Sequence, residues 1–159
     1  MMNEPHLLLQ RLNAIGESLS RRDTALALIG LGSVGVERGR LDRYSDLDFF
    51  VIVKPGSKVQ YLNDLAWLTD VAPVAYCFMN TQDGYKVLYE DGIFCEFAVF
   101  EEAELKGIPF AQGQLVWRAG TVNEAIATPL YAAGEAQEQP PAAWLIGEAL
   151  TNLYVGMLR

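Results

Sequence analysis

The spacing of apolar and polar residues divides the chain into helical segments and short strands. Residues 6–20 place apolar side chains every three or four positions, which predicts an amphipathic helix. Its apolar positions are Leu7, Leu8, Leu12, Ile15 and Leu19. Residues 57–71 predict a second helix with Ser57 as the candidate N-cap. The apolar positions of this second helix are Leu62, Leu65, Ala66 and Leu68.

Short runs rich in β-branched and aromatic residues predict strands, because such side chains pack well on a pleated surface. The predicted strands are residues 25–31, 47–53, 74–79, 85–90, 93–100 and 114–118. The pair Asp91-Gly92 predicts a β-hairpin with a type I′ turn between the fourth and fifth of these runs. Residues 80–84 are expected to form the turn before this hairpin.

The segments between the strands predict the remaining elements. Residues 34–38 are expected to form a short helix after a glycine turn, and residues 39–45 a polar loop. Residues 101–106 are expected to form a short acidic helix or turn. Helices and strands in this order predict an α/β (α+β) domain with a mixed β-sheet flanked by helices.

The composition changes near the end of the chain. Residues 135–141 are polar and proline-rich, which is typical of a linker. We therefore expect a core domain over residues 1–134 and a C-terminal part over residues 135–159. Residues 142–159 predict a helix with an apolar face. That face is expected to dock on the core, to meet a second copy or a partner protein, or to begin a helical domain.

The net charge of the chain limits the classes of binding partner that we expect. The net charge is -8, whereas a general nucleic-acid binder would carry a basic face, so no nucleic-acid partner is expected. Nucleotide phosphates are still compatible with this charge, because a bound divalent cation reverses the local sign. Glu4 and the lack of a long apolar run argue against a signal peptide or membrane span, so we expect a cytoplasmic protein. Cys77 and Cys95 form no CxxC motif and are expected to be free, partly buried thiols.

Two acids stand at the start of the most apolar strand. Asp46 and Asp48 precede and enter the run Phe49 to Val53. Side chains alternate across a strand, so both acids are expected on one face, with Leu47 on the other. Two carboxylates on one face repel each other unless a cation lies between them. Magnesium is the natural candidate, because it is held by one or two carboxylates together with substrate phosphates.

A third acid and a glycine turn extend this candidate site. Glu96 is the only charged residue between Ile93 and Phe100, and a lone carboxylate among apolar residues favours a cleft or a metal. If its strand lies beside that of Asp46 and Asp48, the three acids suit two metal ions. The turn Gly32-Ser33 ends the first strand and allows close approach to a phosphate.

These motifs resemble one family. Gly32-Ser33, twelve intervening residues and Asp46-Leu47-Asp48-Phe49 are similar to the signature of the DNA polymerase β-like nucleotidyltransferases. Glu96 resembles the third acid of that superfamily. The stretch from Gly32 to Val53 is most similar to small-molecule nucleotidyltransferases that modify aminoglycoside and lincosamide antibiotics.

The resemblance implies a fold, a reaction and residue roles. It implies a nucleotidyltransferase fold and the transfer of a nucleoside monophosphate from ATP, or another nucleoside triphosphate, to a hydroxyl of a small molecule. Asp46 and Asp48 would bind two Mg²⁺ ions, and Glu96 would bind one of them and activate the hydroxyl. Gly32 and Ser33 would hold the phosphates. An arginine of the connection is expected to assist; the candidates are Arg38, Arg40 and Arg43.

Other interpretations remain open at this point. A minimal nucleotidyltransferase of this kind can act as an antitoxin that binds or nucleotidylates a partner protein. A non-catalytic nucleotide-binding module with the same fold is a further alternative. Asp46 and Asp48 could also be solvated strand-end acids, and Glu96 could face solvent on an edge hairpin.

Overall fold

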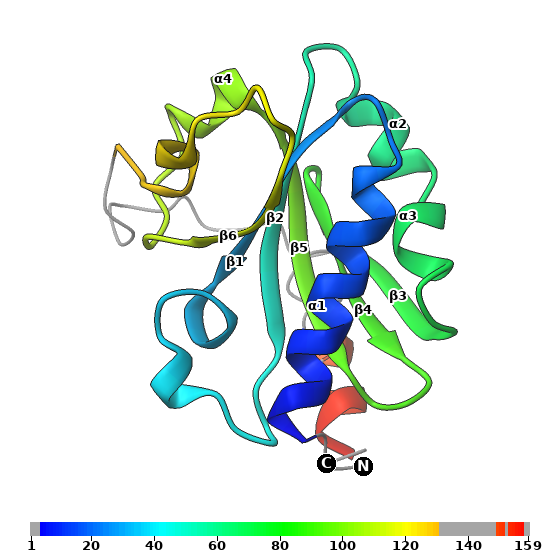
Figure 1. Ribbon diagram of the computed structural model, residues 1–159. Coiled ribbons are helices and arrows are strands. Elements are labelled where there is room, and N and C mark those ends of the chain that lie inside the picture. The colour runs from blue at the N-terminus through cyan, green and yellow to red at the C-terminus, as the bar shows by residue number, and fades with distance from the viewer. Residues whose placement is uncertain (1–3, 131–148, 152, 158–159) are drawn as a thin grey trace.

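A six-stranded mixed β-sheet runs through the molecule, and helices pack against it (Figure 1). The computed structural model describes residues 4–130, 149–151 and 153–157. The strands are β1 (Ala25–Leu31), β2 (Leu47–Val53), β3 (Val74–Thr81), β4 (Gly84–Tyr89), β5 (Phe94–Glu101) and β6 (Gln114–Arg118). All six lie where the sequence predicts a strand, and the predicted bounds of β1, β2 and β6 are confirmed.

The strand order is β3-β4-β5-β2-β1-β6. β2 and β5 pair in parallel, and the other neighbouring strands among those described pair antiparallel. β5 therefore lies inside the sheet, between β4 and β2. The parallel register places Asp48 opposite Glu96. This arrangement confirms the predicted mixed sheet and excludes an edge position for the strand that carries Glu96.

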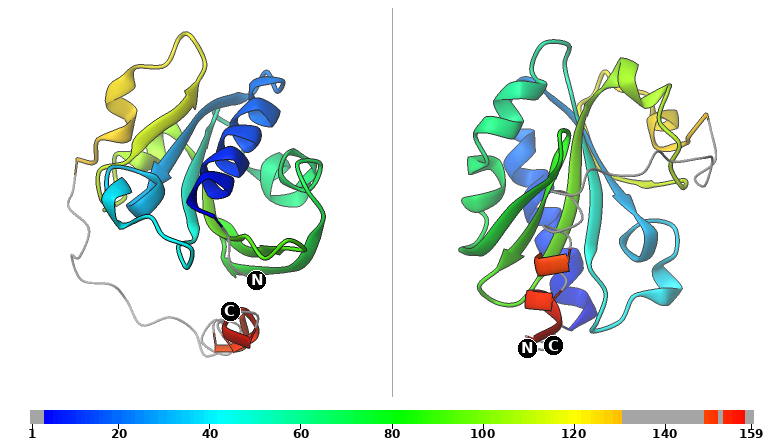
Figure 2. Two further views of the ribbon diagram at one scale, coloured as in Figure 1. Left: turned by 60° about the horizontal axis from the view of Figure 1, so that its bottom comes forward. Right: turned by 180° about the vertical axis from the view of Figure 1, so that it is seen from behind.

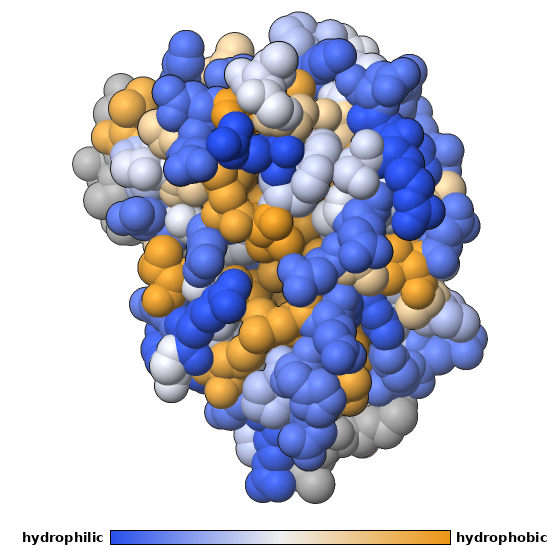
Figure 3. All heavy atoms as spheres, viewed as in Figure 1, coloured by the Kyte–Doolittle hydropathy of each residue, from blue (hydrophilic) through white to orange (hydrophobic). Residues whose placement is uncertain are grey.

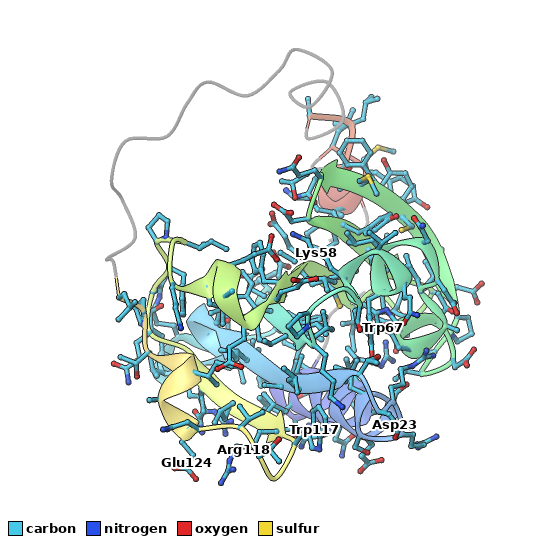
Figure 4. The ribbon with its side chains drawn as sticks, turned by 90° about the horizontal axis from the view of Figure 1, so that it is seen from above. Asp23, Lys58, Trp67, Trp117, Arg118 and Glu124 are labelled. Atoms are coloured by element: carbon cyan, nitrogen blue, oxygen red, sulfur yellow. The ribbon has the colours of Figure 1, made fainter. Side chains whose placement is uncertain are left out.

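One face of the sheet is covered by helices. They are α1 (Pro5–Ser20), α2 (Lys58–Asn63) and α3 (Ala66–Thr69). Figure 1 shows α1 lying across this face, and Figure 3 shows that its outward surface is mostly hydrophilic. The core beneath contains Phe49 and Phe97, whose rings stack with centroids 5.5 Å apart. Trp67 of α3 is fully buried and meets the Phe97 ring edge-on, which anchors α3 to the sheet (Figure 4).

The opposite face carries two separate apolar clusters. In the first, the ring of Phe50 packs edge-on against Phe100 and Phe110. α4 (Glu102–Leu105) contributes Leu105 to this cluster. In the second, Val155 packs against other apolar side chains, namely Leu88 and Phe94. Residues 149–151 and 153–157 are helical and lie on this side of the molecule (Figure 2). Polar side chains occupy the strand positions between the two clusters.

The second predicted helix is interrupted. α2 ends at Asn63 and α3 begins at Ala66, whereas the sequence predicts one helix over residues 57–71. Asp64 has an extended backbone, and its Oδ1 accepts a hydrogen bond from the Ala66 N–H at 2.9 Å. This local bond competes with helix continuation and begins a new turn. Ser57 occupies the N-cap position of α2, as predicted, but its side chain makes no capping hydrogen bond.

Two predicted turns differ in detail. The hairpin between β4 and β5 is confirmed, but its connection spans residues 90–93, and only Gly92 in it has a positive φ, of 87°. The type I′ prediction is therefore wrong, because that turn requires two positive φ angles. The turn before β4 is also shorter than predicted. Asn80 belongs to β3 and is 97% buried, so it is part of the sheet and not of a surface turn.

The segment after β1 folds back on the strand instead of forming the predicted helix. Two 3₁₀ turns, η1 (Gly32–Val34) and η2 (Arg38–Arg40), replace a helix over residues 34–38. The reason is close packing: a Cβ atom on Gly30 would lie 2.7 Å from the Val34 carbonyl oxygen, and one on Gly35 would lie 2.6 Å from the Gly30 carbonyl oxygen. The glycines thus hold the turn directly above the end of β1.

The C-terminal predictions can be compared only in part. The predicted linker over residues 135–141 and the start of the following helix lie outside the described residues.

None of the helices in the described part of the chain has the length and hydropathy that crossing a bilayer requires. Cys77 and Cys95 are both free, as predicted; Cys95 is buried and Cys77 is exposed.

The packing of Gly30 gives a test of the turn. Gly30→Ala is expected to destabilise the protein by roughly 1–3 kcal/mol, because the added methyl group overlaps backbone that cannot move away freely. Gly39→Ala is the matched control: a Cβ there meets nothing within 4 Å, so stability should change by less than about 0.5 kcal/mol. Urea unfolding of both variants measures the difference. Equal stability of the two variants would contradict the tight-turn interpretation.

Candidate active site

The candidate site begins with two carboxylates on neighbouring parallel strands. Asp48 of β2 and Glu96 of β5 are direct register partners, so their side chains project from the same face of the sheet. Leu47 and Phe49 project from the other face and are buried under the helices, as predicted. The sequence prediction that the strands of Asp48 and Glu96 are neighbours is therefore confirmed.

The ammonium group of Lys86 and the carboxamide of Asn80 lie next to these two carboxylates. Lys86 of β4 is the antiparallel partner of Glu96, and its Nζ lies 3.7 Å from Glu96 Oε2. Lys86 is only 7% exposed, whereas the Glu96 side chain is 45% exposed. The Nδ2 of Asn80 donates a hydrogen bond of 2.9 Å to Glu96 Oε1. The two oxygens of Glu96 are thus approached by different neighbours, which fixes the orientation of the carboxylate.

The electrostatics of Asp48 are the most perturbed in the site. Burial, and after it the negative charges of Glu96 and Asp46, together raise the pKa of Asp48 from 3.8 to about 7. The ammonium group of Lys86 acts in the opposite direction but does not restore the ordinary pKa. The three strands therefore hold a carboxylate whose charge is not fully compensated by protein side chains at neutral pH. A perturbed acid in a cavity is typical of a functional site.

Two cavities meet at Asp48. The first has a volume of about 320 Å³ and lies over β2 and β5. Its lining residues are Leu31, Asp48, Phe49, Phe50, Asn80, Thr81, Glu96, Phe97 and Ala98. The second has a volume of about 760 Å³ and lies under the turn after β1. Its lining includes Gly32, Ser33, Arg40, Asp46 and Asp48. The structure thus brings the glycine turn, both aspartates and Glu96 to one continuous region.

The glycine turn lies directly beside the acid. Gly32 has a φ of +54°, and a Cβ atom built on it would lie 3.9 Å from Asp48 Oδ2. A glycine is needed here because other residues adopt this backbone conformation rarely. The absence of a side chain leaves the turn open toward Asp48, at the place where the sequence predicts phosphate binding.

The candidate arginines differ in how close they lie to the glycine turn. Arg43 does not appear among the residues that line the second cavity; its guanidinium lies 4.9 Å from the centre of the Tyr44 ring. Arg40 does line the cavity, and its Nη1 lies 2.6 Å from Glu37 Oε2. The basic side chain best placed to contact a ligand near Gly32 is therefore Arg40.

The donor atoms fit a hard divalent cation in part. Within the described residues, no group of three or more His, Cys, Asp or Glu side chains forms a ready-made metal centre. Magnesium, however, is usually held by one or two carboxylates and completes its shell with water and phosphate oxygens. Asp48 and Glu96 supply two such carboxylates. A further oxygen, Asn80 Oδ1, is buried and has no hydrogen-bond partner among the described residues.

Sequence reasoning missed two members of the site. Lys86 and Glu96 lie at equal distances on either side of Asp91, so the hairpin register could have identified Lys86. Asn80 carried no such signal, because it was assigned to a turn. No protein-family model matches the chain, and no curated protein matches it significantly.

The pKa of Asp48 predicts a pH dependence of stability. Its pKa is higher in the folded protein than in the unfolded chain, so the folded state binds the extra proton between about pH 4 and pH 7. Ionisation of Asp48 should therefore cost stability as the pH rises through this window, by up to about 4 kcal/mol. Asp48→Asn is expected to be as stable as the wild type near pH 4 and more stable at pH 8.

Urea unfolding in the presence of EDTA measures this difference, because bound cations would mask it. The exposed Asp23, at the other end of β1 (Figure 4), provides the control. Asp23→Asn should keep the wild-type dependence on pH. A stability gap between wild type and Asp48→Asn that is the same at pH 4 and pH 8 would contradict the assignment.

Proposed function

We propose that the protein is a magnesium-dependent nucleotidyltransferase with the fold of the DNA polymerase β-like superfamily. It would transfer a nucleoside monophosphate from ATP, or another nucleoside triphosphate, to a hydroxyl of a small molecule. The observation that carries this proposal is the register of β2 and β5, which sets Asp48 beside Glu96 with Gly32 next to Asp48. A phosphate-binding turn and paired acids at one place are what phosphoryl chemistry requires.

The proposed roles follow from the two cavities. Gly32 and Ser33, with Arg40, would hold the triphosphate in the larger cavity. Asp46 and Asp48 would bind Mg²⁺ at the boundary between the cavities. When bound, magnesium neutralises the triphosphate and the charge that develops at the transferred phosphorus.

Glu96 would act on the acceptor side of the site. Its carboxylate faces the smaller cavity, where it would orient the acceptor hydroxyl and take its proton. A bond then forms between the acceptor oxygen and the α-phosphorus, while the bond from that phosphorus to the leaving pyrophosphate breaks. Lys86, whose Nζ lies 3.7 Å from Glu96 Oε2, would hold the Glu96 carboxylate in place for this step. The aromatic and aliphatic part of the cavity wall would contact the apolar part of the acceptor.

A second candidate is a nucleotidyltransferase that binds or modifies a partner protein. It is favoured by the C-terminal helix, whose exposed residues follow a helical spacing of three and four. These residues are Leu150, Leu153, Tyr154 and Met157. Such a stripe is typical of a helix that packs against another surface. Labelling of a co-purifying protein with radioactive ATP, and not of small hydroxylated compounds, would favour this candidate.

Nucleotide binding tests the assignment of the acids. Isothermal titration with ATP and MgCl₂ is expected to give binding to the wild type and at least about ten-fold weaker binding to Asp48→Asn, because one carboxylate ligand of the cation is lost. Asp23→Asn should bind like the wild type. Absence of ATP binding in the wild type, or unchanged binding in Asp48→Asn, would refute the proposal. Binding without transfer to any acceptor would instead indicate a non-catalytic module.

The two arginines form a matched pair for the phosphate site. Arg40→Ala is expected to weaken ATP binding by several-fold, because Arg40 lines the cavity beside Gly32 and Ser33. Arg43→Ala should have a smaller effect, since Arg43 lies on the Tyr44 ring. The same titration measures both variants. A larger loss in Arg43→Ala than in Arg40→Ala would assign the phosphate role to Arg43 instead.

A further inference from the structure

Asn80 is the buried polar residue that the proposed roles leave incompletely explained. It is 97% buried, and its Nδ2 donates to Glu96 Oε1 at 2.9 Å. Its Oδ1 is buried as well and has no hydrogen-bond partner among the described residues. Unsatisfied buried acceptors are rare in folded proteins and call for a specific reason. Asn80 also lines the cavity that Asp48 and Glu96 share.

We propose that Asn80 is a ligand of the cation that Asp48 and Glu96 bind, through its Oδ1. In the structure its amino group faces Glu96, where two oxygens would repel each other. When a cation occupies the site, the carboxamide rotates by half a turn about the Cβ–Cγ bond and presents Oδ1 in place of the amino group. This inference rests on the proposed function for the identity of the ion as magnesium.

The observed distance, an ordinary hydrogen-bond length, also permits this exchange. Magnesium demands near-octahedral geometry with oxygen ligands at 2.0–2.1 Å, so adjacent ligands at right angles lie about 2.9 Å apart. Asn80 Nδ2 and Glu96 Oε1 are 2.9 Å apart. After the rotation Oδ1 would occupy the position of Nδ2. The two oxygens would then already be separated by the edge of a magnesium octahedron, with no backbone movement.

The ion pair between Lys86 and Glu96 does not obstruct this rotation of the Asn80 carboxamide. Lys86 approaches Oε2, whereas Asn80 approaches Oε1, so the ion pair and the proposed ligand use different oxygens. The rotation leaves the amino group in the buried position that Oδ1 occupies now. Coordination of the cation is therefore the gain that would drive it. An amide that only oriented Glu96 would have no reason to rotate.

Two substitutions separate a ligand from a positioning residue. Asn80→Asp keeps an oxygen ligand but removes the N–H donor, whereas Asn80→Ala removes both. We expect Asn80→Ala to weaken binding of Mn²⁺, used alone as the probe and followed by electron paramagnetic resonance, by about ten-fold or more. Asn80→Asp should bind Mn²⁺ at least as tightly as the wild type. Asn63→Asp, which adds the same charge at an exposed position on α2, controls for a general electrostatic gain.

The outcomes distinguish this inference from the proposed function. If Asn80→Asp loses Mn²⁺ binding as Asn80→Ala does, Asn80 acts only through its N–H group and the inference is overturned. If Asn63→Asp tightens binding as much as Asn80→Asp, the gain is electrostatic and the inference is likewise overturned. If the wild type binds Mn²⁺ but transfers no nucleotide, the proposed function fails while the ligand assignment stands.

A measurement on the unmodified protein covers the case in which the variants do not fold. In ¹⁵N-labelled wild type, Mg²⁺ is expected to shift the side-chain amide resonances of Asn80, because the amino group leaves Glu96 on rotation. Asn63 should show no shift at the same concentrations. Saturation of the protein with Mg²⁺ without any change in the Asn80 side-chain signals would overturn the inference.

Discussion

The parallel pairing of β2 with β5 is the constraint on which the rest of the structure depends. It sets Asp48 directly beside Glu96 on a half-buried face, where burial and then the charges of Glu96 and Asp46 raise the pKa of Asp48. Lys86 acts in the opposite direction from β4. Under the proposed function, a divalent cation and its phosphates would compensate the negative charge that remains. Each proposed role follows from this one juxtaposition.

The fold keeps this face available by packing its helices elsewhere. α1, α2 and α3 cover the opposite face, where Phe49 and Phe97 stack beneath Trp67. On the face of the acids, apolar clusters form at either side and leave the centre polar. The glycine-rich turn after β1 then closes over one end of the row. The helix-covered core and the candidate site therefore lie on different faces of one sheet. The fold can thus contain a pair of carboxylates without disrupting this core.

Sequence reasoning predicted the strands well because their hydrophobic runs are short, continuous and bounded by glycine, proline or acidic residues. It also singled out Glu96, a lone charge in an apolar run, as the acid that would join the aspartates if its strand lay beside theirs. It failed where long-range packing or a single side chain determines the local backbone structure. The helix after Ser33 is replaced because Gly30 and Gly35 pack together, and Asp64 divides the second helix. Asn80 was missed because β3 continues to Thr81, beyond the predicted end at residue 79. Asn80 therefore lies in the strand, where it is buried, and not in the turn.

The proposed function requires that residues of β2 and β5 bind a divalent cation together with a nucleoside triphosphate. A crystal structure of the protein with Mn²⁺ and a non-hydrolysable ATP analogue would decide this, because manganese is located by its anomalous scattering. We expect an anomalous peak in contact with Asp48 and the triphosphate beside Gly32 and Ser33. Manganese and nucleotide bound away from these residues, with Asp48 and Glu96 in contact with neither, would contradict it.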